Sequence, residues 1–219
     1  MKRRGEMTVF ISHSDRLYDD LFQEVGWRLV GDAGEADLIC FTGGSDVSAS
    51  IYGDKSHPRA FLPDLARDLS ETALYDYAIT NKKSLVGICR GAQLLCALNR
   101  GKLVQHMNGH GGGSHEVITL SGGDGDSPRI REDFLVTSSH HQMMLPDASN
   151  AEVILVSSKL SGIYELDDVN HSADLPYDIE GVFWEKTRSL GVQYHPEWME
   201  KGSRGRKWFH EQVESRLFN

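Results

Sequence analysis

Cysteine is scarce in this chain of 219 residues, and the three present, Cys40, Cys89 and Cys96, form no obvious set. An odd number of cysteines cannot pair completely into disulfides, and their spacing is not that of a zinc site. Free thiols are typical of a reducing compartment, so we expect a cytoplasmic protein.

Long apolar runs and an excess of positive charge are also missing. No segment approaches the ~20 apolar residues that span a bilayer, and the charged start of the chain does not resemble a signal peptide, so we expect no membrane partner. Asp and Glu number 32 against 23 Lys and Arg, which gives a formal net charge of −9. This acidity argues against a nucleic-acid partner, because such an interface needs clustered basic residues.

The composition is that of an ordinary globular protein, with 39% hydrophobic and 25% charged residues. The length suits one α/β domain over residues 1–219, and neither a repeat nor a low-complexity linker suggests a boundary.

Short apolar segments alternate with helical periodicity in the first half of the chain. Strands are predicted at 8–12, 36–41 and 84–88, and helices at 15–25, 64–81 and 92–99. Such alternation implies a mostly parallel sheet with helices on both faces.

The second half has closely spaced strands, which indicate antiparallel additions to the sheet. These strands are predicted at 116–120, 152–156, 182–184 and 190–194. A closing helix at 204–218 is expected to be anchored by Trp208, Val213 and Leu217, with His210 in solvent.

The sharpest chemical signal is Gly87-Ile88-Cys89-Arg90-Gly91-Ala92-Gln93, where a predicted strand runs into Cys89 and a predicted helix follows. This is the thiol form of a nucleophile elbow, whose strained turn leaves no room for side chains at the flanking glycines. The helix N-terminus favours a thiolate, and the Arg90 N–H is suited to hold an oxyanion. Cys40 and Cys96 are expected in the core.

A cysteine nucleophile needs a base, and His195 in Gln193-Tyr194-His195-Pro196-Glu197 fits that role best among ten histidines. It follows a predicted strand, and Glu197 is close enough to hold one imidazole nitrogen while the other faces the thiol.

Two other histidine groups admit different interpretations. His106, His110 and His115 suggest a metal site, but their spacing is irregular, so we expect a pocket-lining loop and predict neither a metal nor another cofactor. The segment His140-His141-Gln142 suits a substrate rim and an ordinary polar turn about equally.

The order of these motifs resembles the class I glutamine amidotransferase superfamily. Further details resemble its γ-glutamyl hydrolase branch (peptidase C26), which includes γ-glutamyl-γ-aminobutyrate hydrolases. Those details are Gly43-Gly44-Ser45-Asp46-Val47, Tyr52-Gly53, Arg67-Asp68 and Ser139-His140-His141-Gln142.

The resemblance implies a flavodoxin-like α/β fold and a Cys-His-Glu triad of Cys89, His195 and Glu197. It also implies an oxyanion hole made by the N–H groups of Gly44 and Arg90. The implied substrate-binding residues are Gly43, Gln93, Ser139, His140, His141 and Gln142.

The implied reaction is attack of Cys89 on a γ-carbonyl, followed by hydrolysis of a γ-glutamyl thioester. The small-molecule substrate is glutamine or a γ-glutamyl amine, and the alternative is a glutaminase subunit with a separate synthetase partner. The branch's Asp-Gly-x-x-Glu stretch is replaced by Gly162–Glu165 and Asp178–Gly181, near the expected substrate rim. These departures bear on which amine is the leaving group, and not on the nucleophile. The sequence leaves the oligomeric state open.

Overall fold

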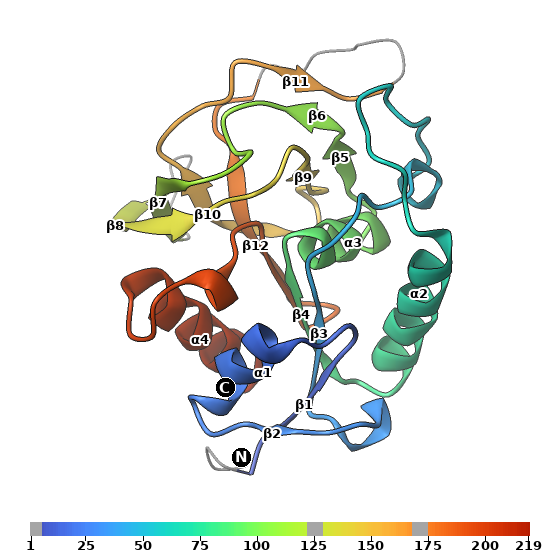
Figure 1. Cartoon of the computed structure of the whole chain (residues 1–219), viewed down its shortest axis with the longest axis vertical. Coiled ribbons are helices and arrows are strands. Elements are labelled where there is room, and N and C mark those ends of the chain that lie inside the picture. Colours follow the sequence, from blue (N-terminus) through green and yellow to red (C-terminus); the bar gives the residue numbers. More distant parts are fainter. Residues whose placement is uncertain (1–5, 122–128, 168–174) are drawn as a thin grey trace.

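The computed structural model describes residues 6–121, 129–167 and 175–219, and its largest element is a nine-stranded sheet (Figure 1). The helices are α1 (Arg16–Gln23), α2 (Leu65–Thr80), α3 (Arg90–Leu98) and α4 (Arg204–Leu217). The strands of the large sheet are β1 (Thr8–Ile11), β2 (Arg28–Leu29), β3 (Leu38–Phe41), β4 (Ser84–Ile88), β7 (Ser114–Ser121), β8 (Arg129–Thr137), β10 (Glu152–Ser157), β12 (Ile179–Trp184) and β13 (Ser189–Val192).

The sheet has the order β2-β1-β3-β4-β13-β12-β10-β7-β8. The strands from β2 to β13 pair in parallel, and those from β13 to β8 pair antiparallel. The predicted α/β fold with antiparallel additions is therefore confirmed. Four short strands form two further pairs, β6 (His106–Met107) with β11 (Tyr164–Glu165) and β5 (Lys102–Val104) with β9 (Met143–Leu145).

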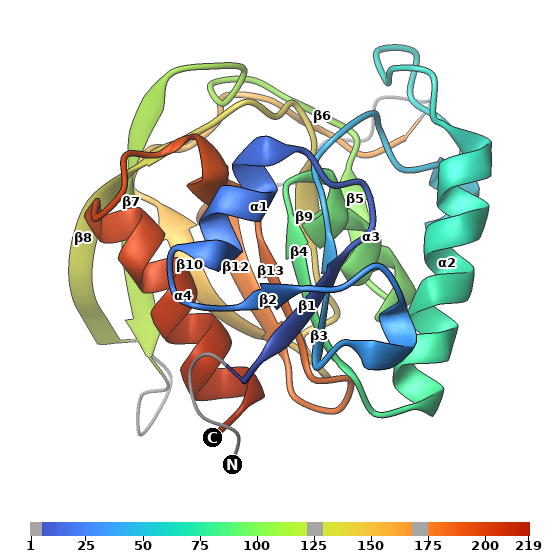
Figure 2. The same ribbon diagram turned by 60° about the horizontal axis from the view of Figure 1, so that its bottom comes forward.

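Helices cover both faces of the parallel part of the sheet, with α1 and α4 on one side and α2 and α3 on the other (Figure 2). Along β3, Leu38 and Cys40 join the core under α1 and α4, whereas Ile39 and Phe41 join the opposite core. This alternation follows from the twofold period of a strand. A strand buried on both faces therefore has the continuous apolar sequence that identified it.

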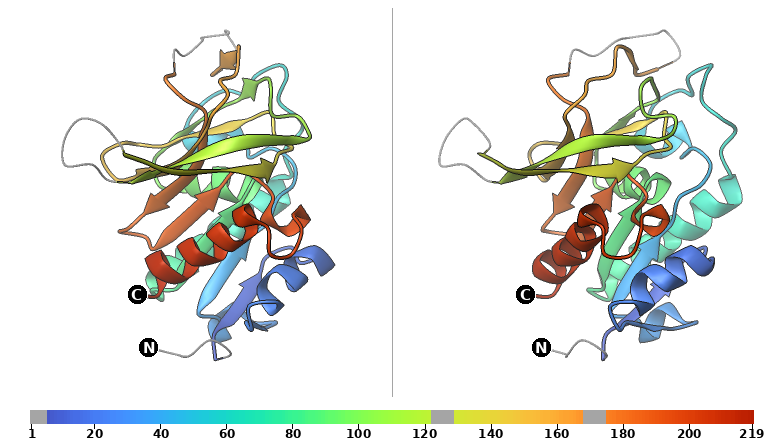
Figure 3. Two further views of the ribbon diagram at one scale, coloured as in Figure 1. Left: turned by 90° about the vertical axis from the view of Figure 1, so that its left-hand side faces the viewer. Right: turned by 60° about the vertical axis from the view of Figure 1, so that its left-hand side comes forward.

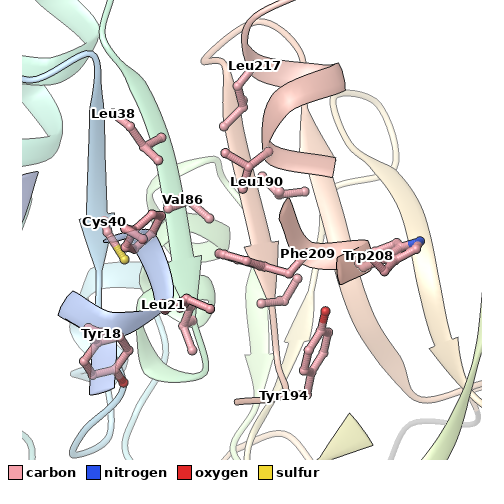
Figure 4. Packing of buried hydrophobic residues seen from close by; sticks show 14 of the residues in the cluster. Tyr18, Leu21, Leu38, Cys40, Val86, Leu190, Tyr194, Trp208, Phe209 and Leu217 are labelled. Atoms are coloured by element: carbon pink, nitrogen blue, oxygen red, sulfur yellow. The ribbon is translucent and has the colours of Figure 1, made fainter. Parts of the chain in front are cut away.

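The core beneath α1 and α4 is built on aromatic side chains (Figure 4). Phe209 of α4 packs edge-on against Phe22 of α1, with ring centroids 6.2 Å apart, and both are fully buried. Burial of each such ring stabilises the fold, because truncation of a buried phenylalanine to alanine typically costs about 3–5 kcal/mol. The packing fixes α1 and α4 on the sheet.

The closing helix has the predicted anchors, since Trp208, Val213 and Leu217 are all buried. The prediction that His210 lies in solvent was wrong, because it is 8% exposed and its Nε2 lies 3.2 Å from Glu24 Oε1. The β7–β8 ribbon extends over α4 (Figure 3), and α4 is therefore covered on more than one side.

Most predicted elements are present with shifted ends, but the short strands and the long strand β8 were not predicted from the sequence. The strand predicted at 190–194 ends at Val192 in the structure, so Gln193 and Tyr194 lie beyond the end of the strand. None of the helices in the described segments has the length and apolarity needed to cross a bilayer. The glycine-rich sequence of residues 121–126 predicts a turn, and residues 122–126 lie outside the described residues.

Candidate active site

Cys89 occupies the junction between β4 and α3 in a strained backbone conformation. Its φ and ψ angles are +52° and −110°, a region that residues with side chains rarely adopt. The strain is maintained because the chain must turn from the last residue of a central strand into the first turn of a helix. The side chain is thereby placed at the carboxyl ends of the parallel strands, where open α/β folds bind ligands.

The glycines on either side of this turn are required by close packing. A Cβ atom on Gly87 would lie 2.4 Å from the carbonyl carbon of Gly91, and one on Gly91 would lie 2.1 Å from the Phe41 carbonyl oxygen. Real Cβ atoms do not approach other atoms this closely, so a larger residue would push α3 away from β3 and β4. The steric reason inferred from the sequence therefore applies at both positions.

Sheet topology explains how His195 comes to the same site. Strands β4 and β13 are parallel neighbours, with Val192 opposite Ile88, and the Cys89 N–H donates to the Val192 carbonyl at 2.8 Å. Both strands therefore end at the same edge of the sheet. Three residues beyond β13, His195 has reached the pocket that Cys89 lines.

Glu197 folds back onto His195 through a short 3-10 turn, Pro196–Trp198. Its Oε1 accepts a hydrogen bond from His195 Nδ1 at 2.6 Å, and both side chains are buried. Burial by itself lowers the pKa of His195, but hydrogen bonds and charge from Cys89 and Glu197 raise it to about 9. The site therefore favours an imidazolium at neutral pH.

Trp198 is a further neighbour of His195 that the sequence did not single out. The two rings are parallel, 3.6 Å between centroids and 3° between planes, and Trp198 is half-exposed at the mouth of the pocket. An indole face attracts a cation, so this stacking also favours the protonated imidazole. Its position three residues after His195, in a short turn, gives no periodic signal from which the contact could have been found.

Gly43 and Gly44 follow β3 and lie against the same pocket. A Cβ atom on Gly43 would lie 3.0 Å from His195 Cε1 and 3.7 Å from Cys89 Cβ, so its backbone is close to both. Gly44 has a φ of +152°, and a Cβ there would meet Arg67 Nη1 at 2.3 Å. Arg90 is the first residue of α3, and the first N–H groups of a helix have no partner within it.

Arg67 of α2 holds the Gly43 loop by hydrogen bonds to its carbonyl groups. Its Nη1 donates to the Gly43 oxygen and its Nη2 to the Thr42 oxygen, each at 3.0 Å, while Nε donates to Glu71 at 3.1 Å. The resemblance drew attention to Arg67, but only the structure shows that it acts on this loop.

A buried ion-pair network joins the two segments that carry the candidate oxyanion donors. Arg90 pairs with Asp68 at 2.5 Å and with Glu71, which also binds Arg67. Coulombic attraction from Arg90 and Arg67 outweighs burial and lowers the pKa of Glu71. Glu71 therefore stays ionised, and the network braces both segments against α2.

Tyr18 of α1 contacts the opposite side of the Gly43 loop. The Gly43 N–H donates to the Tyr18 hydroxyl at 2.9 Å. Burial and the nearby charge of Glu197 raise the pKa of Tyr18, so the phenol stays protonated. Tyr18 is thus placed between the loop and the carboxylate that holds His195, a role that the amphipathic pattern of α1 does not reveal.

The residues predicted to bind substrate are divided between the pocket and the interior. Ser139 lines the pocket with Gly43, whereas Gln93 and Gln142 are buried, and Gln93 Nε2 donates to the Gln142 carbonyl at 3.2 Å. His141 is partly buried, with Nε2 3.0 Å from Asp46 Oδ1. Gln93 therefore supports the segment that presents Ser139.

The pocket has a volume of about 350 Å³. Its lining residues are His13, Asp15, Tyr18, Thr42, Gly43, Gly44, Cys89, Ser139, His195 and Trp198. A larger depression of about 800 Å³ lies at the other end of the sheet, beside Met7 and Trp27. Cysteine and histidine are absent from its lining in the described part of the chain, so the smaller pocket is the candidate active site.

The expected pocket-lining histidine loop lies elsewhere. His110 and His115 meet His140 and the buried Glu180. Within the described residues, His110, His115 and Glu180 form the group suited to a metal ion. His106 lies outside it, with its ring stacked near His57 at 5.9 Å. Asp178 and Glu180, expected near the substrate rim, are fully buried.

Comparisons with known proteins agree with the fold and the motifs. Residues 33–197 match the Peptidase C26 family. Protein NtpR of Enterococcus hirae is 29% identical over 182 residues, which cover 74% of this chain and 67% of NtpR. A YvdE homologue of Lactococcus lactis subsp. cremoris, named a glutamine amidotransferase-like protein, is 31% identical over 156 residues, covering 61% of this chain and 83% of its own.

A solved glutamine amidotransferase from Thermotoga maritima has the same fold. It superposes with a TM-score of 0.61 over 98% of this chain and 86% of its own, at 15% sequence identity. With the match over residues 33–197, this chain belongs to the Peptidase C26 family, within the class I glutamine amidotransferase-like superfamily.

Proposed function

We propose that this protein hydrolyses the γ-amide of glutamine or of a γ-glutamyl amine through a thioester on Cys89. Membership of the family supports amide hydrolysis or glutaminase-type activity. The observation that carries it is the shared pocket of Cys89 and His195, with His195 Nδ1 bonded to Glu197 at 2.6 Å.

In the first half-reaction, the Cys89 thiolate attacks the γ-carbonyl carbon and the carbonyl oxygen becomes an oxyanion. The backbone N–H groups of Gly44 and Arg90 are the proposed donors to this oxygen. The imidazolium of His195 gives its proton to the departing nitrogen, so that ammonia or an amine leaves and a γ-glutamyl thioester remains.

In the second half-reaction, neutral His195 takes a proton from water, and the resulting hydroxide attacks the thioester carbon. The C–S bond breaks, glutamate leaves and the thiolate–imidazolium pair is restored. Glu197 keeps the Nδ1 proton in place throughout, which leaves the other ring nitrogen for the reaction.

The first experiment is amine and ammonia release by the purified chain alone, with L-glutamine and a panel of γ-glutamyl amines. We expect turnover of at least one compound by the wild type and loss of that turnover in Cys89→Ala. A mass increase of one glutamyl group on Cys89 after rapid quenching would identify the thioester. Unchanged turnover in Cys89→Ala would refute the mechanism.

A glutaminase subunit that supplies ammonia to a separate synthetase is the second candidate. It is favoured by exposed apolar side chains beside the Gly43 loop: Phe61, Leu62 and Leu65 are 66%, 92% and 62% exposed. Phe61 is joined to that region, because its N–H donates to Asp46 at 2.7 Å. Alkylation of Cys89 by a glutamine-like electrophile, without turnover of any compound, would favour this candidate.

A further inference from the structure

Three histidines and a glutamate meet in a buried group separate from the Cys89 pocket, here called the His–Glu cluster: His110, His115, His140 and Glu180. Glu180 Oε1 lies 3.3 Å from His110 Nδ1, 3.0 Å from His115 Nε2 and 3.4 Å from His140 Nε2. The exposed fractions of the four side chains are between 0% and 8%. The sequence separates them by up to 70 residues, so folding alone creates the cluster.

The facing atoms are close but poorly aligned for hydrogen bonding. His110 Nδ1, His115 Nε2, His140 Nε2 and both Glu180 oxygens are buried without a hydrogen-bond partner in the described part of the chain. Buried polar atoms are normally satisfied, so a group of them in one place needs an explanation. A ligand shared by all of them provides one.

The spacing suits a transition-metal ion. Zinc binds histidine nitrogen and carboxylate oxygen at about 2.0–2.2 Å, which places the ligand atoms of a tetrahedral site about 3.3 Å apart. The three contacts of Glu180 Oε1 have lengths of 3.0–3.4 Å, and the ligand atoms of His110, His115 and Glu180 all lie within 4.8 Å of one another. His140 Nε2, 3.4 Å from the same oxygen, would be the fourth ligand, although it is not part of the group that lies within 4.8 Å.

Outer hydrogen bonds direct two of the histidines toward the centre of the cluster. His110 Nε2 lies 2.7 Å from Asp178 Oδ2, and His140 Nδ1 lies 2.9 Å from the carbonyl oxygen of Gln142. Each oxygen accepts the proton of the outer nitrogen, which leaves the inner nitrogen of a neutral ring with a free lone pair. Metal-binding histidines almost always have such outer partners.

Charge balance points the same way. Asp178 and Glu180 are both fully buried, and burial of two carboxylates is costly without compensating positive charge. In the described segments the ion pairs of both residues are with histidines. One divalent cation would neutralise both carboxylates while the histidines remain uncharged.

We propose that His110, His115, His140 and Glu180 bind one divalent transition-metal ion of the zinc class. Four protein ligands make a closed site, which is typical of structural rather than catalytic zinc. The ion would join β7, β12 and the loops that follow β6 and β8. It would thereby fix the segment that presents Ser139 to the pocket, since the His140 N–H donates to the His110 carbonyl at 2.9 Å.

The test uses the full chain without a polyhistidine tag, stripped with a chelator and dialysed against Zn²⁺ or Co²⁺. We expect one metal ion per chain by elemental analysis, and intense visible Co²⁺ bands typical of four-coordinate geometry. His115→Asn and Glu180→Gln should each bind Zn²⁺ at least tenfold more weakly. Asp178→Asn, which changes only an outer partner, should weaken binding by about 10- to 100-fold.

His106→Asn is the matched control, because His106 lies in the same stretch of chain but outside the cluster, and it should bind like the wild type. Zn²⁺ should raise the Tm of the wild type and of this control, but not that of His115→Asn. If Glu180→Gln does not fold, His115→Asn decides, since His115 lies nearest the surface. Substoichiometric binding by the folded wild type, or wild-type affinity in His115→Asn, would overturn the proposal.

Discussion

Replacement of Glu197 by glutamine tests how the candidate base is held. The pKa of His195 is raised from 6.5 to about 9, which corresponds to a net stabilisation of its imidazolium by ~3 kcal/mol. Because burial opposes this shift, Cys89 and Glu197 together supply more than the net value. Glu197→Gln removes the charge from a hydrogen bond of 2.6 Å and also allows an amide N–H to face Nδ1.

Two losses should therefore combine in Glu197→Gln. The pKa of His195 falls, so the imidazolium loses its proton at lower pH, and part of the population adopts the wrong tautomer. If the carboxylate supplies about half of the ~3 kcal/mol, loss of its charge should lower the rate about tenfold. Misorientation of the His195 ring adds to this, so the expected loss of kcat/KM is about 10²- to 10³-fold.

The assay is the pH dependence of kcat/KM and of Cys89 alkylation by iodoacetamide. In the wild type the thiolate–imidazolium pair should persist until the pH approaches about 9, and in Glu197→Gln this alkaline limit should move to lower pH. Glu200→Gln is the matched control, because Glu200 is exposed three residues away. An unchanged kcat/KM and alkaline limit in Glu197→Gln would refute the assigned role of the carboxylate.

Three further substitutions probe the surroundings. Gly91→Ala places a Cβ 2.1 Å from a carbonyl oxygen of β3 and should lower stability by about 1–3 kcal/mol in thermal melts, whereas Gly31→Ala, with open space around it, should not. Arg67→Met removes the bonds to the Gly43 carbonyl and should lower kcat about tenfold with little effect on KM; a pure KM effect would contradict this. Trp198→Leu removes the stacked indole and should lower the alkaline limit of activity with little loss of Tm, and an unchanged pH profile would argue against the cation–π contribution.

The parallel core and the turn at Gly87–Gly91 could be predicted from the sequence, because both depend on local rules. A strand buried on two faces must be apolar throughout, as Leu38–Phe41 and Ser84–Ile88 are. A strained turn between strand and helix must have glycine where Cβ atoms would collide, as at Gly87 and Gly91. The short strands and β8 were missed, because pairing across a sheet leaves little periodic signal in two to nine residues.

The tertiary structure decided which residues far apart in the sequence meet around Cys89. Only the parallel pairing of β4 with β13 brings His195 to the end of the strand that carries Cys89, although 106 positions separate them in the sequence. Trp198, Tyr18 and Arg67 gain their contacts from elements whose own patterns are those of ordinary helices and turns.

The histidines show the same division most clearly. Irregular spacing argued against a metal site in the segment from His106 to His115, because the sequence can reveal a ligand set only when its members recur at regular intervals. The fold separates His106 from its neighbours and adds His140 and Glu180 from distant strands and loops. Local residue patterns thus indicated the central strands, the turn and the candidate nucleophile. The groups that surround Cys89, and those that meet at Glu180, were determined by sheet order, because only packing brings distant side chains within bonding distance.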